Sequence, residues 1–593
     1  MAAIITSKFR FHNAEQFKES FSEAAPTNYY MFIGRPSAFA SGTTGGSDSA
    51  PPTPVDNRRL EAYTWDDMLA AKKIDSTGVT HAIPRRDLDV SGATTYDMYR
   101  PNYSASNTAK SGATSLFDST FYFMTSAYRV YKVLDNGGGT GIAWTAAEPT
   151  SEARDPFAVP VTGGNYWIKY MFTLTTTQVQ NFLTPDFIPT LITPQAAGNV
   201  RSDGGLDIIK VTTAGLSLQG GSAWGEAADR EVLNVPIRGD GTGGLCKVTI
   251  GGVSGTADGT VTDCRVTSAN EDHSGYTQGT VLPADIIEQH NIQFSGGALT
   301  FSANPAFEVI IGPDGGHGSN PARELGGHFC LTDVKLQQTE AFDFSVVNDF
   351  RQIGIVRNPY SYGTTSAFTG STARQTFAVK IDTTAGVFQV DEKIYQTIAG
   401  KVASGITSFA GSGGTVTVTC GAAHNLTSGQ MVKVTGGTFA TNATGHQGTH
   451  HITVTSPTVF TYKVTTSMAP SGSFTKGSVA YTTFSPQGIV VEWEATNKIL
   501  FYVQNVYDNQ GTDATWKQNI PFGGNSTITG DTSNATGVPH VASSATVNNT
   551  VFVAGYASPE LQPDTGDVIY IENRKPISRA SDQTEDVKLV VEF

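Results

Sequence analysis

Four short segments in the second half of the chain alternate apolar and polar residues: VTVT at 416–419, MVKV at 431–434, HITV at 451–454 and FTYKV at 460–464. Successive side chains of an extended strand point to opposite faces, so this alternation predicts strands with one buried face. The spacing of the segments, with turn-forming residues between them, is typical of a small antiparallel β-sandwich. We interpret residues 405–476 as a β-sandwich module inserted into a host domain.

The composition of the whole chain favours the same class of fold. The chain has 593 residues, of which 63 are Gly, and 16% of its residues are charged. Glycine supports tight turns, and 32 Phe with 21 Tyr can fill several thin β cores. A chain of this length is too long for one hydrophobic core. The sequence therefore predicts a multidomain α+β protein that is mostly β, with antiparallel β-sandwich domains.

Shifts in composition divide the chain into five expected parts. We expect an N-terminal α+β domain with short helices at 1–200, a Gly/Thr-rich β insertion at 201–281, a central β-rich domain at 282–404, the inserted module at 405–476, and a C-terminal β-rich domain at 477–593 that completes the host fold. Insertions of this kind are tolerated because the entropy of loop closure grows slowly with loop length.

The N-terminal part carries the helix signals and two neighbouring strand signals. Asn13 with Gln16 has the spacing of a capping box, and a second helix is expected to begin at Thr64. Residues 121–124 and 128–134 are rich in aromatic and β-branched residues and are predicted to form strands. Helices on antiparallel strands indicate an α+β domain.

Charge and cysteine spacing argue against several classes of function. The formal net charge is −14, and no Lys/Arg-rich stretch is present, so no nucleic-acid partner is expected. Four cysteines (246, 264, 330 and 420) lie far apart, which favours isolated buried thiols over a zinc site or a disulfide framework. No apolar run approaches the ~20 residues that span a bilayer, so no membrane insertion is expected. The N-terminus lacks a signal-peptide pattern, and assembly in a reducing cytoplasm is expected.

No residue pattern predicts catalytic, cofactor or metal chemistry. GxSxG, HExxH and Walker motifs do not occur. His446 and His450 would share a face only on a helix, and the glycines around them indicate a loop, so metal binding is the less favoured interpretation. His317 in GPDGGHG (312–318) is expected to be a turn residue or to bind backbone. We expect a non-enzymatic protein without a cofactor.

Motifs near the two ends of the chain are the most specific signal. ITSKFR occupies 5–10, IPRRD occupies 83–87, and the C-terminus reads GDVIYIENRKPI at 566–577 followed by DQTED at 582–586. A weaker motif, NYWIKY, lies at 165–170. Together these stretches resemble the baseplate wedge protein family, gene product eight, of T-even-like contractile-tailed bacteriophages. The resemblance covers the ends well and the middle in patches, and its most specific part is the C-terminal motif.

The resemblance implies a structural subunit of the tail baseplate wedge that contributes to baseplate assembly and to its rearrangement on sheath contraction. It also implies a homodimer within each wedge, contacts with other baseplate wedge proteins, and a place in the virion after assembly in the host cytoplasm. The candidate interface or family-motif residues are Lys8, Arg10, Arg85, Arg86, Asp87, Trp167, Tyr570, Glu572, Asn573, Arg574, Asp582, Gln583 and Glu585.

Two interpretations of the motif residues remain open at this point. The charged groups either hold a neighbouring subunit or form a solvated loop with surface ion pairs worth ~0–1 kcal/mol each. In the IPRRD motif, Arg85, Arg86 and Asp87 either orient one another or meet a carboxylate of a partner. Asn573 and Pro576 are expected to force a turn after the C-terminal strand.

The main alternative function is a receptor-binding or polysaccharide-depolymerising tail protein. The Gly/Thr-rich β modules support it, as do Trp144 and Trp224 if these aromatics are exposed. Such proteins are usually trimers built on a repeating β-helix, and the sequence shows no fixed repeat period. An adhesin-like role for the inserted module alone is a third possibility. The RGD at 238–240 is expected to be a solvated turn.

Overall fold

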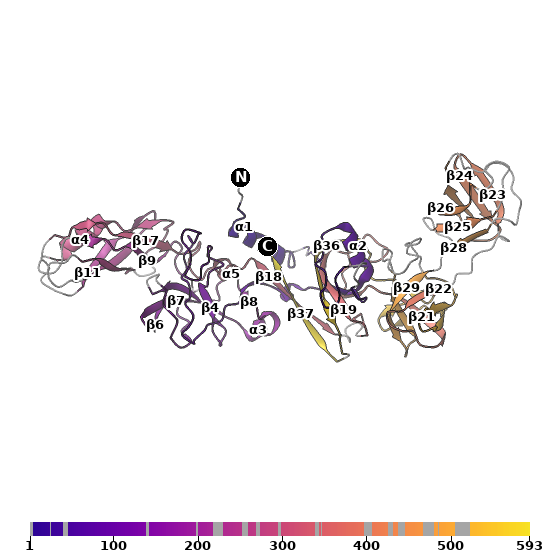
Figure 1. Cartoon of the computed structure of the whole chain (residues 1–593), viewed down its shortest axis with the longest axis horizontal. Coiled ribbons are helices and arrows are strands. Elements are labelled where there is room, and N and C mark those ends of the chain that lie inside the picture. Colours follow the sequence, from indigo (N-terminus) through magenta and orange to yellow (C-terminus); the bar gives the residue numbers. More distant parts are fainter. Residues whose placement is uncertain are drawn as a thin grey trace. The chain divides into compact units, whose positions relative to one another are not determined.

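The structure is a computed structural model of the 593-residue chain, drawn in Figure 1. It describes all residues except 1–3, 24, 26, 40–44, 138–140, 197, 199, 218–228, 252–258, 268–272, 295–297, 338–342, 345–346, 397–405, 425–430, 437–444, 466–479, 484–485, 505–521 and 581. Contacts divide the chain into two compact units: unit 1 comprises residues 1–25, 75–333 and 588–593, and unit 2 comprises residues 26–74 and 334–587. The five expected domain boundaries stay predictions.

Antiparallel sheets dominate the structure, which confirms the predicted mostly β, multidomain α+β fold. Unit 1 contains a sheet in the order β4-β5-β7-β6. A second sheet has the order β37-β18-β3-β8, and its strands β37 and β18 contribute residues to both units. The strands are β3 (Val79–Pro84), β4 (Tyr122–Met124), β5 (Arg129–Asn136), β6 (Phe157–Val161), β7 (Gly164–Thr173), β8 (Phe187–Thr190), β18 (Phe329–Gln337) and β37 (Thr584–Glu592).

The rest of unit 1 consists of short helices and small sheets. The helices are α1 (Ser7–Glu19), the 3-10 helix η1 (Ser76–Gly78), α3 (Thr176–Phe182), α4 (Pro283–Gln293) and α5 (Pro321–Leu325). The small sheets pair β9 (Leu206–Thr213) with β17 (Ala306–Ile311), β10 (Leu216–Ser217) with β16 (Phe301–Ala303), β12 (Arg238–Gly239) with β15 (Gly279–Thr280), and β11 (Arg230–Pro236) with β13 (Leu245–Ile250) and β14 (Val261–Val266). Cys246 and Cys264 lie in the core of this part, as expected for buried free thiols.

Unit 2 contains a five-stranded sheet in the order β20-β2-β1-β19-β36, with helix α2 (Arg58–Asp67) preceding β2. Its strands are β1 (Tyr29–Gly34), β2 (Met68–Lys73), β19 (Phe350–Arg357), β20 (Thr372–Arg374) and β36 (Asp567–Ile577). The Phe32 ring of β1 lies so close to Gly354 of β19 that a Cβ at residue 354 would clash with the ring. Phe32 packs with Tyr30, Trp65 and Val356 in the core of this sheet.

A second sheet of unit 2 closes on itself. Its order is β30-β29-β22-β31-β32-β21-β35, and an additional pairing of β30 with β21 completes the closure. Closure removes the exposed edges of these strands. The strands are β21 (Phe377–Ala385), β22 (Lys393–Gln396), β29 (Gln487–Glu494), β30 (Ile499–Val503), β31 (Ile528–Gly530), β32 (Thr536–Pro539) and β35 (Tyr556–Ala557), and a separate hairpin joins β33 (Thr546–Val547) to β34 (Thr550–Val551).

The strands predicted between residues 416 and 464 form one sheet in the order β23-β24-β27-β26-β25-β28. Its strands are β23 (Ile406–Ser412), β24 (Thr415–Cys420), β25 (Met431–Thr435), β26 (Gly448–Ser456), β27 (Val459–Lys463) and β28 (Ala480–Thr483). The alternation works as predicted, because Val416, Val418, Ile452 and Phe460 are buried in a common core. The last strand ends at Thr483, seven residues beyond the expected boundary at 476.

Deleting residues 405–483 should leave the rest of unit 2 folded. The chain leaves the closed sheet at Gln396 and returns at Pro486, and the Gln396 amide donates to the Pro486 carbonyl at 3.0 Å. The remaining residues can therefore bridge this gap without strain. We expect the free energy of unfolding to change by less than ~1 kcal/mol, or about 4 °C in Tm. Scanning calorimetry of the full and shortened chains measures this, and loss of cooperative unfolding would show that the deleted sheet belongs to the host core.

Two helix starts were predicted wrongly. Helix α1 begins at Ser7 with Thr6 as N-cap, whose hydroxyl accepts from the Phe9 amide, so Asn13 lies inside the helix. Helix α2 is capped by Asn57 and has ended by Met68. In both helices a polar residue earlier in the chain accepts a hydrogen bond from a free backbone amide of the first turn. The predicted cap residue then lies in the middle of α1 or in the last turn of α2. The strand predictions for 121–124 and 128–134 are confirmed by β4 and β5.

Candidate functional site: the terminal segments and their charged contacts

The two ends of unit 1 meet in the structure. Helix α1 lies beside the C-terminal residues (Figure 1). The Arg10 Nε donates to the Phe593 carbonyl at 2.5 Å, and the Arg10 guanidinium forms an ion pair with Glu592. The Phe17 and Phe593 rings lie 5.2 Å apart. The candidate residue Arg10 therefore links helix α1 to the C-terminal residues through a hydrogen bond and an ion pair.

Strand β36 carries the C-terminal motif along one edge of the five-stranded sheet. Tyr570 donates its hydroxyl hydrogen to Glu572 at 2.8 Å, and Glu572 lies 3.6 Å from Arg574. Burial, followed by the bond to Glu572, raises the pKa of Tyr570. The Asn573 side chain donates to the Pro52 carbonyl at 2.9 Å.

The turn predicted at Asn573 and Pro576 does not form. Strand β36 continues through both residues to Ile577. The physical reason is a shift in register between Asn573 and Ile577, which leaves Pro576 without a paired residue on β19, so its missing N–H removes no ladder hydrogen bond.

The candidate residues that follow β36 differ in how deeply they are buried. Glu585 is buried and forms an ion pair with the buried Arg579 at 2.7 Å. Asp582 and Gln583 are exposed, and the Gln583 amide donates to the Ala580 carbonyl. One candidate residue of this group is thus internal to the fold, and two lie on its surface.

The sequence of this region is similar to a known family. Residues 537–593 match the family model Phage-Gp8, described as Bacteriophage T4, Gp8. These residues are named the Phage-Gp8 segment for that similarity. The matched family is that of a structural protein of the phage baseplate wedge. None of the curated proteins shows a significant match to the chain.

The Phage-Gp8 segment contains strands β36 and β37 and the whole C-terminal motif. This confirms the resemblance predicted from GDVIYIENRKPI and DQTED. The stretches at 5–10 and 83–87 lie outside the matched residues, so their resemblance stays a prediction. The contact between Arg10 and the last two residues nevertheless joins the N-terminal stretch to the Phage-Gp8 segment.

In the IPRRD motif, Arg85 contacts Asp87 and Arg86 contacts residues outside the motif. The Arg85 Nε lies 3.0 Å from both carboxylate oxygens of Asp87. Arg86 donates to the Phe117 carbonyl at 2.8 Å, and its guanidinium lies 4.5 Å from the centre of the Tyr122 ring. A contact of these residues with a partner carboxylate stays a prediction.

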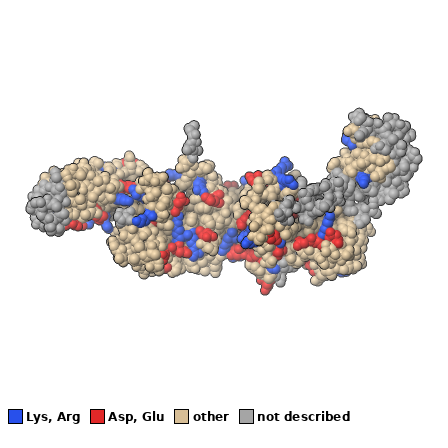
Figure 2. Space-filling view, viewed as in Figure 1, with Lys and Arg blue, Asp and Glu red and all other residues tan. Residues whose placement is uncertain are grey.

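The remaining candidate residues lie at or near the surface of unit 1. Lys8 forms an exposed ion pair with Asp314 at 2.7 Å. Trp167 is half-buried, and the Arg265 guanidinium lies 5.7 Å from the centre of its ring. Figure 2 shows basic and acidic side chains side by side on the face in view, which agrees with these ion pairs.

One of the two aromatics expected to be exposed is buried. Trp144 is completely buried, and its indole nitrogen donates to the Ala146 carbonyl at 2.9 Å. It fills the core on one face of the β4-β5-β7-β6 sheet, which a sequence without strand register cannot show. Trp224, the other aromatic, lies outside the described residues.

The three RGD residues are exposed, as expected for a solvated segment, and their charged side chains also bind other residues of unit 1. Arg238 contacts both carboxylate oxygens of Asp285, at 3.0 and 2.8 Å. Asp240 accepts from the Thr277 hydroxyl and amide and from the Gln278 amide. These bonds, the Thr277 hydroxyl first, lower the pKa of Asp240 to about 2.

A buried charge cluster in unit 1 was missed by sequence reasoning. Lys132 and Glu324 are fully buried and lie 2.9 Å apart, and the Lys132 Nζ lies 2.7 Å from the His317 Nδ1. The Lys132 Nζ also lies 4.0 Å from the centre of the Tyr99 ring. Glu324 accepts from the Gly318 amide at 2.7 Å. His317 lies in a turn, as expected, and its side chain also belongs to this cluster, which the sequence did not predict.

This cluster predicts a pH dependence for unit 1. Burial alone would raise the pKa of Glu324, but Lys132 and then His317 lower it to about 2. A carboxyl group with a depressed folded-state pKa stabilises the fold above its unfolded pKa and loses that contribution as the pH falls. We expect unit 1 to lose stability between about pH 4.5 and pH 2. Urea titrations at several pH values measure this loss, and a Lys132→Met/Glu324→Leu variant should lack this part of it.

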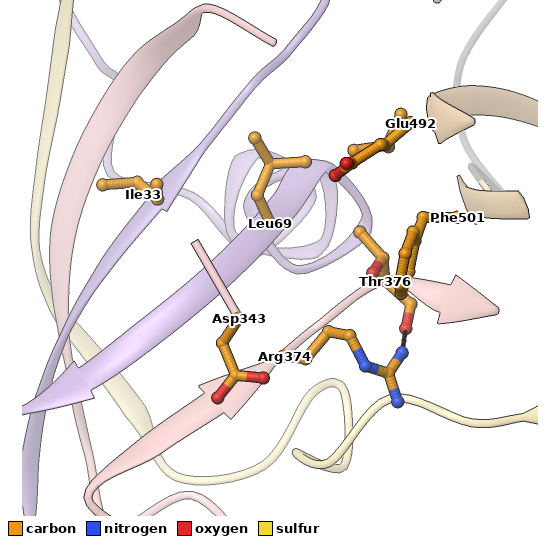
Figure 3. Close-up of a pocket in the computed structure, with 8 residues that line it drawn as sticks. Ile33, Leu69, Asp343, Arg374, Thr376, Glu492 and Phe501 are labelled. Atoms are coloured by element: carbon orange, nitrogen blue, oxygen red, sulfur yellow. Dashed lines mark hydrogen bonds between the residues drawn. The ribbon is translucent and has the colours of Figure 1, made fainter. Parts of the chain in front are cut away.

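A small cavity lies within unit 2 (Figure 3). It is lined by Ile33, Leu69, Asp343, Arg374, Thr376, Val491, Glu492 and Phe501. Its volume is about 20 Å³, which accommodates one water molecule. Arg374 turns toward the Thr376 carbonyl and also donates to the Ser558 carbonyl at 2.9 Å, and burial lowers its pKa. This cavity is too small for an organic substrate.

The histidines of the 405–476 region lie in two settings. His446 lies in a turn and contacts the Gly436 carbonyl at 2.8 Å. His450 is part of strand β26, where its ring stacks on Tyr462 with centroids 4.2 Å apart, so the expected loop is wrong for this residue. In the part of the chain that the structure describes, no three His, Cys, Asp or Glu side chains are grouped to hold a metal ion.

None of the described helices is both long and apolar enough to cross a bilayer.

Proposed function

We propose that this chain is a structural subunit of the tail baseplate wedge of a contractile-tailed phage. The observation that carries the proposal is the Phage-Gp8 match at residues 537–593. In this proposal the protein contributes to baseplate assembly and to its rearrangement when the sheath contracts. It acts without catalysis or a cofactor, in the virion, after assembly in the host cytoplasm.

The proposed partners are a second copy of the chain and other baseplate wedge proteins. Two internal ion pairs support an ordered C-terminal region. The buried Arg579–Glu585 pair and the Arg10–Glu592 pair fix the last strands of the chain. Rearrangement on contraction would then be a rigid-body repacking of interfaces between subunits. Exposed strand edges and rim charges would carry those interfaces.

The candidate interface residues differ in how freely they can reach a partner. Asp582 and Gln583 are exposed, and Glu572 and Arg574 are each 39% exposed. Glu585 is buried and forms an ion pair with Arg579 within the same chain. We therefore propose that the exposed members, and not Glu585, contact neighbouring subunits.

A phage that carries a stop codon in this gene tests the proposed function. We expect intact heads and no complete tails, because a wedge subunit is needed to build the baseplate. Electron microscopy of the lysate and mass spectrometry of purified baseplates give the readout. Complete tails that fail to adsorb to the host would contradict the wedge role and favour the receptor-binding alternative. That alternative has lost one of its supports, since Trp144 is buried.

A further inference from the structure

Strand β36 has one unpaired edge. It is the outermost strand of the five-stranded sheet and pairs only with β19. It has 11 residues, whereas β20 at the opposite edge has three. Among the described residues, no strand pairs with the outer side of β36, and each of its own residues is at least partly exposed. A long unpaired strand offers its backbone groups to a strand of another chain.

The geometry of Gly354 shows which backbone groups point outward. A Cβ on Gly354 in β19 would clash with the carbonyl oxygen of Tyr570, so this carbonyl faces β19. Backbone groups of successive residues in a strand alternate between its two edges. The groups of Ile571 and Asn573 therefore point away from β19, and the register shift between Asn573 and Ile577 ends this regular alternation. Two alternate residues thus present unpaired donors and acceptors along this edge.

The sequence of the strand is complementary to itself when reversed. In an antiparallel pairing centred on Asn573, Glu572 of one copy lies opposite Arg574 of the other, and the same pair occurs twice. Opposite charges directly across a strand pair stabilise it, and like charges destabilise it. Moving the centre of symmetry by one residue in either direction would place Glu572 or Arg574 opposite its own copy, which disfavours those registers.

We propose that β36 pairs antiparallel with β36 of a second copy, with Asn573 at the two-fold axis, so that two five-stranded sheets join into one. This pairing specifies the interface of the homodimer in the proposed function, and it rests on that function for the expectation that the chain self-associates. A second copy fits better than an unrelated strand because one sequence satisfies both charge pairs. A two-fold pairing also closes, which leaves no free β36 edge for further growth.

Charge exchange between two variants of the full chain tests this pairing. Analytical ultracentrifugation should show a wild-type dimer. Glu572→Arg places like charges across both pairs of the dimer, and so does Arg574→Glu, so each variant alone should dissociate about tenfold or more easily. An equimolar mixture of the two variants should form a mixed dimer, because every changed side chain then faces an opposite charge.

The mixture separates contacts between chains from contacts within a chain. Each variant loses the internal Glu572–Arg574 ion pair, and mixing cannot restore that pair within either chain. Recovery of the dimer on mixing therefore reports pairing between copies. Thermal unfolding of each variant checks that both remain folded.

Cysteine cross-linking tests the register. Residues opposite each other in a hydrogen-bonded antiparallel pair have Cα atoms about 5.5 Å apart, within the range of a disulfide. Asn573→Cys should therefore cross-link two copies under mild oxidation. Ile569→Cys is the matched control, since its own counterpart lies far along the partner strand, and it should not cross-link. The four native cysteines are buried, so the wild-type chain gives the background.

A monomeric wild-type chain, or a dimer that neither charge variant weakens, overturns the proposal. Cross-linking at Ile569 in place of Asn573 would overturn the register. These outcomes are independent of the proposed function, whose failure would appear as complete tails in the absence of the protein. A chain that pairs through β36 and is missing from baseplates would retain this inference and lose the wedge role.

Discussion

Replacing Lys132 with Met is expected to lower the free energy of unfolding of unit 1 by about 3–5 kcal/mol. Lys132 and Glu324 are both fully buried, and the lysine supplies the positive charge beside the carboxylate at 2.9 Å. Without it, Glu324 stays in the core as an uncompensated charge or takes up a proton at a cost. Urea unfolding followed by hydrogen exchange in β5 measures the loss.

Two further variants control the Lys132 result. Lys132→Met/Glu324→Leu removes both charges and should recover much of the lost stability, because an apolar pair carries no desolvation cost. Lys8→Met removes an exposed ion pair with Asp314 and should change the free energy of unfolding by only ~0–1 kcal/mol. A Lys132→Met loss as small as that of Lys8→Met would contradict the structural role of the buried cluster.

Replacing Trp144 with Ala is expected to cost unit 1 about 3–5 kcal/mol. The indole is completely buried among Tyr96, Phe123 and Tyr166, with ring centroids 5.0–6.2 Å away, and its removal leaves a cavity that the sheet cannot fill. Chemical denaturation measures the change. Trp167→Ala is the control and should cost less, because Trp167 is only half-buried.

The Trp144 result also bears on function. If Trp144 contacted a receptor, its replacement would impair adsorption and leave the unfolding free energy unchanged. That outcome would contradict the buried position and restore a support of the receptor-binding alternative. Loss of stability with the expected magnitude would place Trp144 among the core residues.

Features that depend on neighbours along the chain could be predicted from the sequence. Strands β24 and β27 alternate buried and partly exposed residues, and their period of two is visible in the sequence. The same holds for the approximate limits of β4 and β5. Local alternation reflects the geometry of a single strand, so no knowledge of its partners is needed.

Features that depend on distant partners could not be predicted. Lys132 resembles a polar residue on an exposed strand face, but both faces of β5 are covered, by cores that contain Val130 on one side and Tyr131 on the other. Its partner Glu324 lies 192 residues away, and no local signal links the two. The glycines around His317 were the one available hint, since Gly316 has a positive φ and approaches the Arg201 backbone too closely for a Cβ.

The C-terminal motif shows the same division. Its residues and their order were sufficient to predict the family, and the match to Phage-Gp8 confirms it. Its conformation was not predictable, because Pro576 signals a turn in isolation and is accommodated in β36 where the pairing with β19 shifts register. The pairing of Arg579 with Glu585 likewise requires the strands on both sides of the intervening loop.

A reconstruction of the intact tail by electron cryomicroscopy tests the central claim most directly. If this chain is a wedge subunit, density for its antiparallel sheets will lie in the baseplate wedges around the central hub, with residues 537–593 at contacts between subunits or within their core. Density for the chain at the tips of trimeric fibres, or its absence from the baseplate, would contradict the account.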